Sequence, residues 1–123
     1  MYIANWRNCT EYEVHGEARE VCILGSSDTS LNECKELPKL PVAKKMLFFN
    51  HAYLTVGRQL ELHMGVSEEI HYIIKGKGVF YHNDETKEVS EGDTIYIPAK
   101  EIHGLENTGL DTLEYLVMGT VVN

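Results

Sequence analysis

The feature that most limits the fold is a series of short β-favouring segments that fills the chain from Phe48 onward. These segments are rich in β-branched and aromatic residues, and turn residues such as Asn83 and Asp84 in the expected hairpin HNDET separate them. Many short strands at close spacing are typical of a sandwich or a barrel. The expected strands lie at residues 52–56, 59–63, 70–74, 79–82, 94–97 and 112–118. The sequence therefore predicts an all-β fold.

The N-terminal part of the chain gives weaker signals. Three segments could be strands, at residues 1–6, 12–14 and 20–24. Ser30 followed by Glu33 resembles a capping box that would start one short helix, ended by Pro38. The stretch 25–41 is expected to be a loop over the barrel, most simply a connection between strands.

The length of the chain predicts one domain. A chain of 123 residues can bury roughly two thirds of its unfolded surface, which gives one core but not two. We therefore expect a single domain over residues 1–123. Within it, residues 1–45 would supply N-terminal strands and a loop, and residues 46–123 would form the barrel.

The composition excludes several classes of partner. The formal charge is −8, and no run of Lys or Arg is longer than Lys44 and Lys45, which argues against nucleic acid and anionic lipid as partners. No apolar stretch approaches the ~18 residues of a spanning helix, and the N-terminal stretch is polar where a signal peptide would be apolar. We expect a soluble, cytoplasmic protein that binds a small molecule. Its three cysteines, Cys9, Cys22 and Cys34, have no CxxC spacing and are expected to be reduced.

Two groups of His and Glu residues stand in fixed frames of Gly and Pro. In the first frame five residues separate Gly57 from His63, and Gly65 follows two positions later. Three further residues lead to Glu69, and six more lead to Gly76. The second frame reads Gly92, five residues, Pro98, then His103 and Asn107.

These two frames resemble the two sequence motifs of the cupin superfamily. The first family motif is Gly, five residues, HxH, three or four residues, Glu, six residues and Gly. The second is Gly, five residues, PxG, two residues, His, three residues and Asn. The chain departs at Gly65, which stands where the family has its second ligand His, and at Lys100, which stands where the second motif has Gly. The first departure matters more because it removes a ligand.

The resemblance implies a single-domain jelly-roll β-barrel with a metal site. Residues that match His63, Glu69 and His103 are metal ligands in the family, held on different strands and converging inside the barrel. Buried His and Glu side chains need partners, and a divalent metal ion satisfies several of their lone pairs at once. The metal would be Fe, Mn, Ni or Zn.

Strand parity supports a shared site. Side chains alternate between the faces of a strand, so Glu69 and His71 point the same way. The same parity would place Gln59, Glu61 and His63 on one face, provided no bulge intervenes. His71 is then a candidate for the missing ligand, although same-face neighbours lie ~6.5 Å apart, and we expect it to line the cavity or to support a ligand.

Alternatives to this site remain open at this stage. In another register Glu61, His63 and Glu68 would be the ligands, but both flanking glycines would then be out of register. The loss of a His at position 65 could also mark a degenerate cupin with a metal-free pocket. His15, His51 and His82 have no such frame and are expected at the surface or at strand edges.

The resemblance does not choose one activity, because the superfamily includes oxygenases, isomerases, epimerases, decarboxylases, lyases, storage proteins and ligand sensors. Our leading hypothesis is a metal-dependent enzyme acting on a small polar organic molecule. Two His and one carboxylate favour a non-haem Fe(II) oxygenase, an oxidoreductase. In an isomerase, epimerase or lyase, His71, Glu61 and Tyr81 are the residues suited to proton transfer. The third possibility is a non-catalytic ligand-binding module. The family resemblance and exposed strand edges predict a homodimer.

Overall fold

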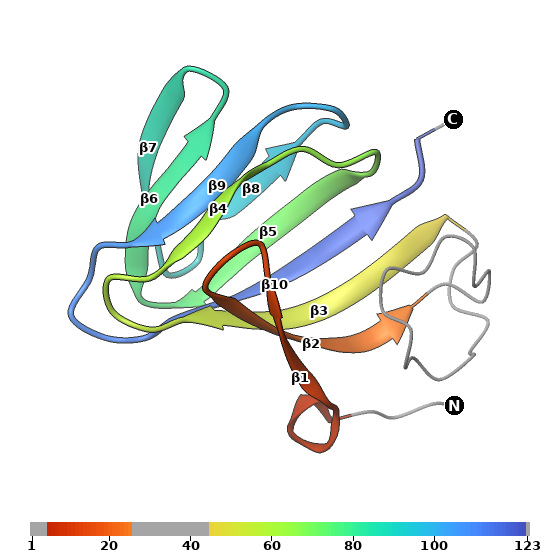
Figure 1. Cartoon of the computed structure of the whole chain (residues 1–123), viewed down its shortest axis with the longest axis horizontal. Coiled ribbons are helices and arrows are strands. Elements are labelled where there is room, and N and C mark those ends of the chain that lie inside the picture. The colour runs from red at the N-terminus through yellow and green to blue at the C-terminus, as the bar shows by residue number, and fades with distance from the viewer. Residues whose placement is uncertain (1–4, 26–44, 123) are drawn as a thin grey trace.

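A computed structural model describes residues 5–25 and 45–122. The fold consists of two antiparallel β-sheets that face each other (Figure 1). The six-stranded sheet has the order β1-β2-β3-β10-β5-β8. The four-stranded sheet has the order β4-β9-β6-β7. The predicted all-β jelly roll is therefore confirmed.

The strands are short and come from the whole described length of the chain. The large sheet contains β1 (Glu11–Val14), β2 (Ala18–Gly25), β3 (Met46–Leu54), β5 (Glu68–Lys75), β8 (Thr94–Ile97) and β10 (Leu113–Thr120). The small sheet contains β4 (Gln59–His63), β6 (Lys77–His82), β7 (Glu85–Ser90) and β9 (His103–Asn107). The helical element of the described residues is a short 3-10 helix, η1 (Trp6–Asn8).

Most predicted strands are present, with several differences. The strand expected at 1–6 lies mostly outside the described residues, and its last residue, Trp6, begins the 3-10 helix instead. The strand expected at 52–56 begins earlier, at Met46, and ends at Leu54. Strands β7 and β9 were not predicted; β7 exposes five of its six side chains, so it carries almost no apolar signal. Most of the expected loop at 25–41 and the capping box at Ser30 lie outside the described residues.

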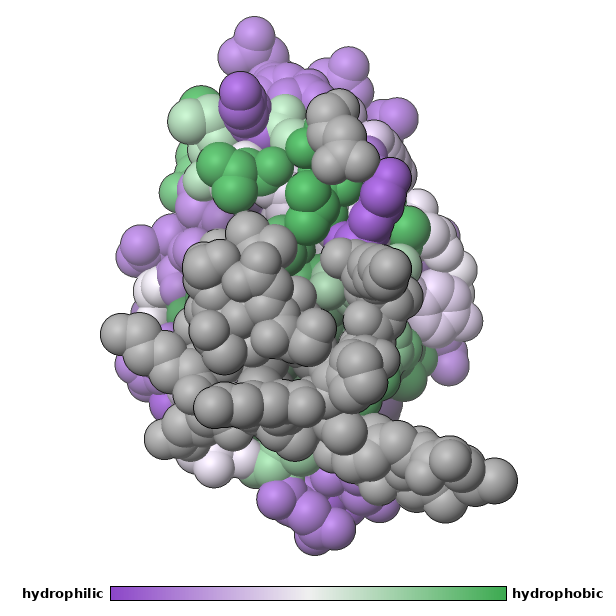
Figure 2. All heavy atoms as spheres, turned by 90° about the vertical axis from the view of Figure 1, so that its right-hand side faces the viewer, coloured by the Kyte–Doolittle hydropathy of each residue, from purple (hydrophilic) through white to green (hydrophobic). Residues whose placement is uncertain are grey.

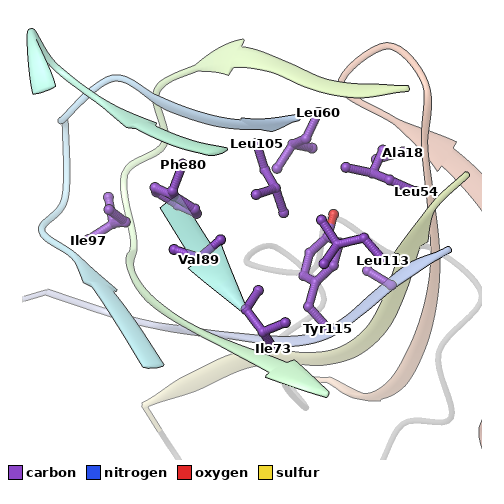
Figure 3. Packing of buried hydrophobic residues seen from close by; sticks show 11 residues of the cluster. Ala18, Leu54, Leu60, Ile73, Phe80, Val89, Ile97, Leu105, Leu113 and Tyr115 are labelled. Carbon is purple, nitrogen blue, oxygen red and sulfur yellow. The ribbon is translucent and has the colours of Figure 1, made fainter. Parts of the chain in front are cut away.

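The core lies between the two sheets (Figure 3) and follows from strand alternation. Along β10, Leu113, Tyr115 and Val117 are buried while the residues between them are only half-buried. On β5 the predicted parity is confirmed: Glu69 and His71 point inward. Each sheet thus turns one face toward the other, and polar residues of β5 reach the interior at one end of an apolar cluster.

The hairpin between β1 and β2 joins the N-terminal edge of the large sheet to the small sheet. At its tip, the backbone carbonyl of His15 accepts a hydrogen bond from the Glu61 N–H at 2.8 Å. The Glu17 N–H donates to the Gln59 carbonyl at 3.2 Å, and Gly16 forms an isolated β-bridge with Leu60. These contacts fix β4 from the side opposite β9.

Several apolar side chains are exposed. Figure 2 shows hydrophobic side chains gathered in the upper half of one face of the molecule. Between β4 and β5, Met64 and Val66 are exposed, by 61% and 75%. Among the described residues no helix is long and apolar enough to cross a membrane. Cys9 and Cys22 form no disulfide with another described residue, and Cys34 lies outside the described residues, so the reduced state of all three stays a prediction.

Candidate metal centre

His63 stands at the end of β4 and is half-buried. Its Nδ1 lies 2.8 Å from the backbone carbonyl oxygen of Glu61. A carbonyl oxygen only accepts, so Nδ1 carries the proton and donates it, which leaves the lone pair on Nε2. Burial lowers the pKa of His63 to about 4, outweighing the backbone hydrogen bond. His63 is therefore neutral at pH 7 and able to bind a metal.

His103 begins β9 and is oriented in the same way. Its Nδ1 donates to the backbone carbonyl of Glu101 at 3.1 Å, so Nε2 again carries the lone pair when the ring is neutral. That Nε2 is buried and has no hydrogen-bond partner in the described structure. A buried acceptor without a partner costs roughly 1–3 kcal/mol, which a bound cation would remove.

Glu69 reaches the same space from β5 and is 8% exposed. Its Oε1 lies 3.7 Å from His103 Nε2 and accepts a hydrogen bond from His71 Nε2 at 3.0 Å. Burial raises the pKa of Glu69, but the imidazoles of His103 and His71 lower it more, so the pKa lies well below its usual range. The carboxylate is therefore ionised at neutral pH.

These three side chains form a group that fits a divalent metal ion. One ligand atom from each of His63, Glu69 and His103 lies within 4.8 Å of the other two. Donors bound to one ion at ~2.1 Å can be at most ~4.2 Å apart, so small side-chain movements are enough. Two imidazoles and one carboxylate suit Fe, Mn, Ni or Zn. The predicted ligands are thus brought together.

Position 65 is open, as its glycine suggests. A Cβ atom built on Gly65 would meet only Glu69 Oε2 at 3.8 Å and Ser67 Oγ at 4.0 Å. The Gly65 carbonyl accepts a hydrogen bond from the Lys100 N–H at 2.8 Å, and Lys100 has φ of +64°. The two departures from the cupin motifs therefore touch each other beside the candidate centre.

The other predicted site residues lie in different places. His71 is buried, holds Glu69 through the hydrogen bond above and is outside the three-residue ligand group. Tyr81 is half-buried and its hydroxyl donates to Glu106 at 3.3 Å. Neither Glu61 nor Tyr81 is among the described residues that line the cavity beside the ligand group.

An irregularity in β4 explains the position of Glu61. The register between β4 and β9 shifts between Leu60 and His63. The predicted common face of Gln59, Glu61 and His63 is therefore wrong: Leu60 is buried, whereas Glu61 is exposed and lies over Gly16. The alternative register also loses support, because the Glu68 carboxylate instead accepts hydrogen bonds from Tyr96 and Thr120.

Sequence reasoning missed two histidines. His15 stacks on His63, with ring centroids 3.6 Å apart, and it lines the cavity. His51 was expected at the surface or a strand edge, but it is 3% exposed and stacks on Trp6. The signal for His15 was the following Gly16, which marks a hairpin tip that could contact another strand.

Beside the ligand group lies a cavity of about 270 Å³ between the two sheets. This volume is just below the ~300–1,000 Å³ of pockets for drug-sized ligands, so it suits a small molecule. The described residues that line it are Tyr12, Glu13, Val14, His15, Glu20, Phe48, Asn50, Leu60, His63, Glu69, His71 and Val117.

Comparison with known proteins agrees with this architecture. Residues 51–119 match the family model for the cupin domain, which is more than half of the chain. The protein therefore belongs to the cupin family. Its fold also resembles the crystal structure of a predicted oxalate decarboxylase from Thermotoga maritima, with a TM-score of 0.78, 24% identity and coverage of 98% of this chain and 100% of that one.

Two relatives are similar in sequence. An oxalate-binding protein of Thermotoga maritima is 35% identical over 83 residues, which cover 67% of this chain and 69% of the relative. An uncharacterised protein of Methanocaldococcus jannaschii is 46% identical over 66 residues, 53% of each chain. The chain thus spans about half the length of that second relative.

Proposed function

We propose that the protein is a metal-dependent enzyme acting on a small polar organic molecule, with the metal held by His63, Glu69 and His103. The observation that carries this proposal is the buried, unpartnered Nε2 of His103, which lies beside an ionised Glu69 and within reach of His63. Both histidines have Nδ1 held by a backbone carbonyl, an arrangement common among metal-ligating histidines.

A metal bound at this position would supply Lewis-acid chemistry or oxygen activation. The residues of the chain would supply ligand positioning, proton transfer and walls that limit water. His71 holds the Glu69 carboxylate in place, and its position in the cavity suits proton transfer better than those of Glu61 and Tyr81. Leu60, Phe48 and Val117 provide apolar walls that limit water. The space at Gly65 leaves room for a substrate near the ligands.

Metal content tests the proposal directly. Protein purified without chelator and reconstituted with Fe, Mn, Ni or Zn should hold close to one equivalent of metal. His63→Ala and His103→Ala should each lose most of it, whereas His82→Ala, which changes a histidine outside the ligand group, should keep it. Less than a tenth of an equivalent in the wild-type protein under every condition would contradict the proposal.

Oxygen consumption then separates the reaction types. Within the enzyme class we favour a non-haem Fe(II) oxygenase, because two His and one carboxylate leave coordination positions open. Candidate substrates should include oxalate, since one relative is an oxalate-binding protein. Substrate-dependent oxygen uptake with Fe(II) would support the oxygenase. Turnover that needs metal but no oxygen would instead support an isomerase, epimerase or lyase.

The second candidate function is a non-catalytic binding module. It is favoured by the sequence similarity to an oxalate-binding protein. Ligand binding by the metal-loaded protein without turnover of any tested ligand, aerobically or anaerobically, would support this module over the enzyme. A cytoplasmic location and a homodimeric state stay predictions in either case.

A further inference from the structure

Neither the backbone conformation nor crowding requires a glycine at position 65. The φ of Gly65 lies outside the left-handed region that favours glycine. A Cβ atom at this position would make only ordinary contacts, with Glu69 Oε2 at 3.8 Å and with Ser67 Oγ at 4.0 Å. A residue with a side chain would therefore fit here, and glycine instead leaves a space beside the candidate metal centre.

Ser67 lies at the wall of this space, because the alternation of β5 continues into the turn before it. Met64 and Val66 are exposed. Ser67, Glu69 and His71 are buried, and Ser67 is only 8% exposed although it is polar. The Ser67 side chain thus points inward, on the same side of the chain as the Glu69 carboxylate.

The two oxygen atoms at this space have unused hydrogen-bonding capacity. The Ser67 hydroxyl makes no hydrogen bond to another described residue, although a hydroxyl can donate one bond and accept two. The contacts of Glu69 with His71 and His103 both use Oε1, so Oε2 is left on the side of position 65. A ligand atom in the place of the missing side chain would lie within 4.0 Å of both Ser67 Oγ and Glu69 Oε2.

The charge of the metal centre determines which ligand suits this space. Two neutral imidazoles and one carboxylate leave a divalent ion with a net charge of about +1, which attracts an anionic ligand. An anionic oxygen bound to the metal on this side could accept a hydrogen bond from the Ser67 hydroxyl. Such a charge-assisted bond is stronger than one between neutral groups. A small carboxylate meets both requirements.

We propose that Ser67 binds the carboxylate group of a small ligand, which occupies the space left by Gly65, coordinates the metal and accepts a hydrogen bond from the Ser67 hydroxyl. The inference rests on the proposed metal site and adds the residue that holds the anionic group of the ligand. Ser67 acts on the ligand and not on the metal, so its substitution should leave the metal in place.

Binding of acetate to Co(II)-loaded protein tests this inference. Acetate has one carboxylate and no other polar group, and the visible absorption of Co(II) changes when a ligand joins the metal. Wild-type protein should give a saturable change with acetate. Ser67→Ala should weaken acetate binding about tenfold, because it loses one charge-assisted hydrogen bond, and should still hold about one equivalent of Co(II).

Three further variants separate the hydroxyl from a general effect of substitution. Ser67→Thr keeps the hydroxyl and should retain most of the affinity for acetate. Ser90→Ala is the matched control, because it removes an exposed serine hydroxyl on β7 in the other sheet, and it should bind acetate like the wild type. Gly65→Val fills the space and should weaken acetate binding at least as much as Ser67→Ala. It also provides a second test should Ser67→Ala fail to fold.

The outcomes distinguish this inference from the proposed function. Equal acetate affinity in Co(II)-loaded wild-type and Ser67→Ala protein would overturn the role of Ser67 and leave the metal site standing. A wild-type Co(II) spectrum that does not respond to acetate would do the same, and would indicate that water alone fills the space. Protein that holds no Co(II) would overturn both proposals.

Discussion

The imidazole rings of His15 and His63 stack face to face, with centroids 3.6 Å apart and planes 8° from parallel. His15 belongs to the hairpin tip between β1 and β2, whereas His63 ends β4. A metal binds histidine at a ring nitrogen, in the plane of the ring, so a stacked neighbour does not compete with it. His15 instead holds the His63 ring from one face, while the Glu61 carbonyl holds its Nδ1.

Removing this support should weaken metal binding. His15→Asn keeps a residue that tolerates the φ of +46° found here but removes the ring. Aromatic pairs are worth about 0.5–1.5 kcal/mol, so the metal dissociation constant should rise by a factor of about 2 to 13. Competition with a chromophoric chelator measures this change. His15→Phe, which keeps an aromatic face, should retain most of the affinity; equal losses in both variants would contradict a stacking role.

Restoring a ligand at position 65 should strengthen metal binding. Gly65 has space for a side chain, because its nearest non-neighbouring atoms are the Glu69 and Ser67 side chains at ordinary contact distances. Gly65→His should raise metal affinity at least tenfold, and the absorption spectrum of the Co(II) form should change with the added nitrogen ligand. Gly65→Ala is the matched control and should leave affinity unchanged. A Gly65→His variant with wild-type affinity would show that position 65 points away from the metal.

The candidate ligands could be predicted from sequence because each stands at a fixed distance from a turn residue. Gly57, Gly92 and Pro98 set where strands end, and the ligand positions follow by counting. Asn107 fits the same pattern: its side chain bonds the carbonyls of Leu54 and Asp111 and the Gly109 N–H, and so holds the turn after β9.

The supporting residues could not be predicted in the same way. The irregularity in β4 has no clear sequence signal, yet it moves Glu61 away from the cavity. The contact between His15 and His63 joins residues far apart in sequence through the closure of the barrel. The cavity wall formed by Glu20 and Asn50 likewise depends on the pairing of β2 with β3, which periodicity alone does not give.

Metal binding should release about one proton between roughly pH 5 and 6.5. Burial lowers the pKa of His63 to about 4, so this ring is already neutral in that range. Burial also lowers the pKa of His103, but the Glu69 carboxylate raises it more, and the net pKa lies above its usual value. Below that raised pKa a metal must displace one proton, from His103, and affinity should rise about tenfold per pH unit.

Calorimetry in buffers of different protonation enthalpy measures this release. As pH rises through the pKa of His103, the release should fall toward zero and the affinity should stop rising. Two ordinary imidazoles would instead release nearly two protons at the acid end of the range. A value near two would therefore mean that His63 is not held neutral by burial.

Lys100 should be a source of instability. Its φ of +64° lies in the left-handed region, which costs a non-glycine residue roughly 1–2 kcal/mol. Lys100→Gly would remove this cost, but part of the stabilisation is lost because glycine has more freedom in the unfolded chain. The substitution should therefore raise the free energy of unfolding by about 0.5–1 kcal/mol. Chemical denaturation measures it. Lys100→Ala, which removes the charge but keeps Cβ, should show no such gain; an equal gain would point to the charge instead.

The outer face of the large sheet should form a homodimer interface. Ile70 on β5 pairs directly with Tyr96 on β8, and Tyr72 lies two residues along β5 on the same face. These side chains are 41%, 51% and 43% exposed, respectively, which leaves a contiguous apolar surface beside the edge strand β8.

Light scattering should therefore return twice the chain mass of 14.0 kDa. Tyr72→Glu should give the single-chain mass with an intact fold, because it buries a charge in the interface. Leu110→Glu changes an apolar side chain that is 91% exposed in the turn between β9 and β10, outside the two strands of this surface, and should stay dimeric. A wild-type mass of one chain, or equal dissociation of both variants, would contradict this interface.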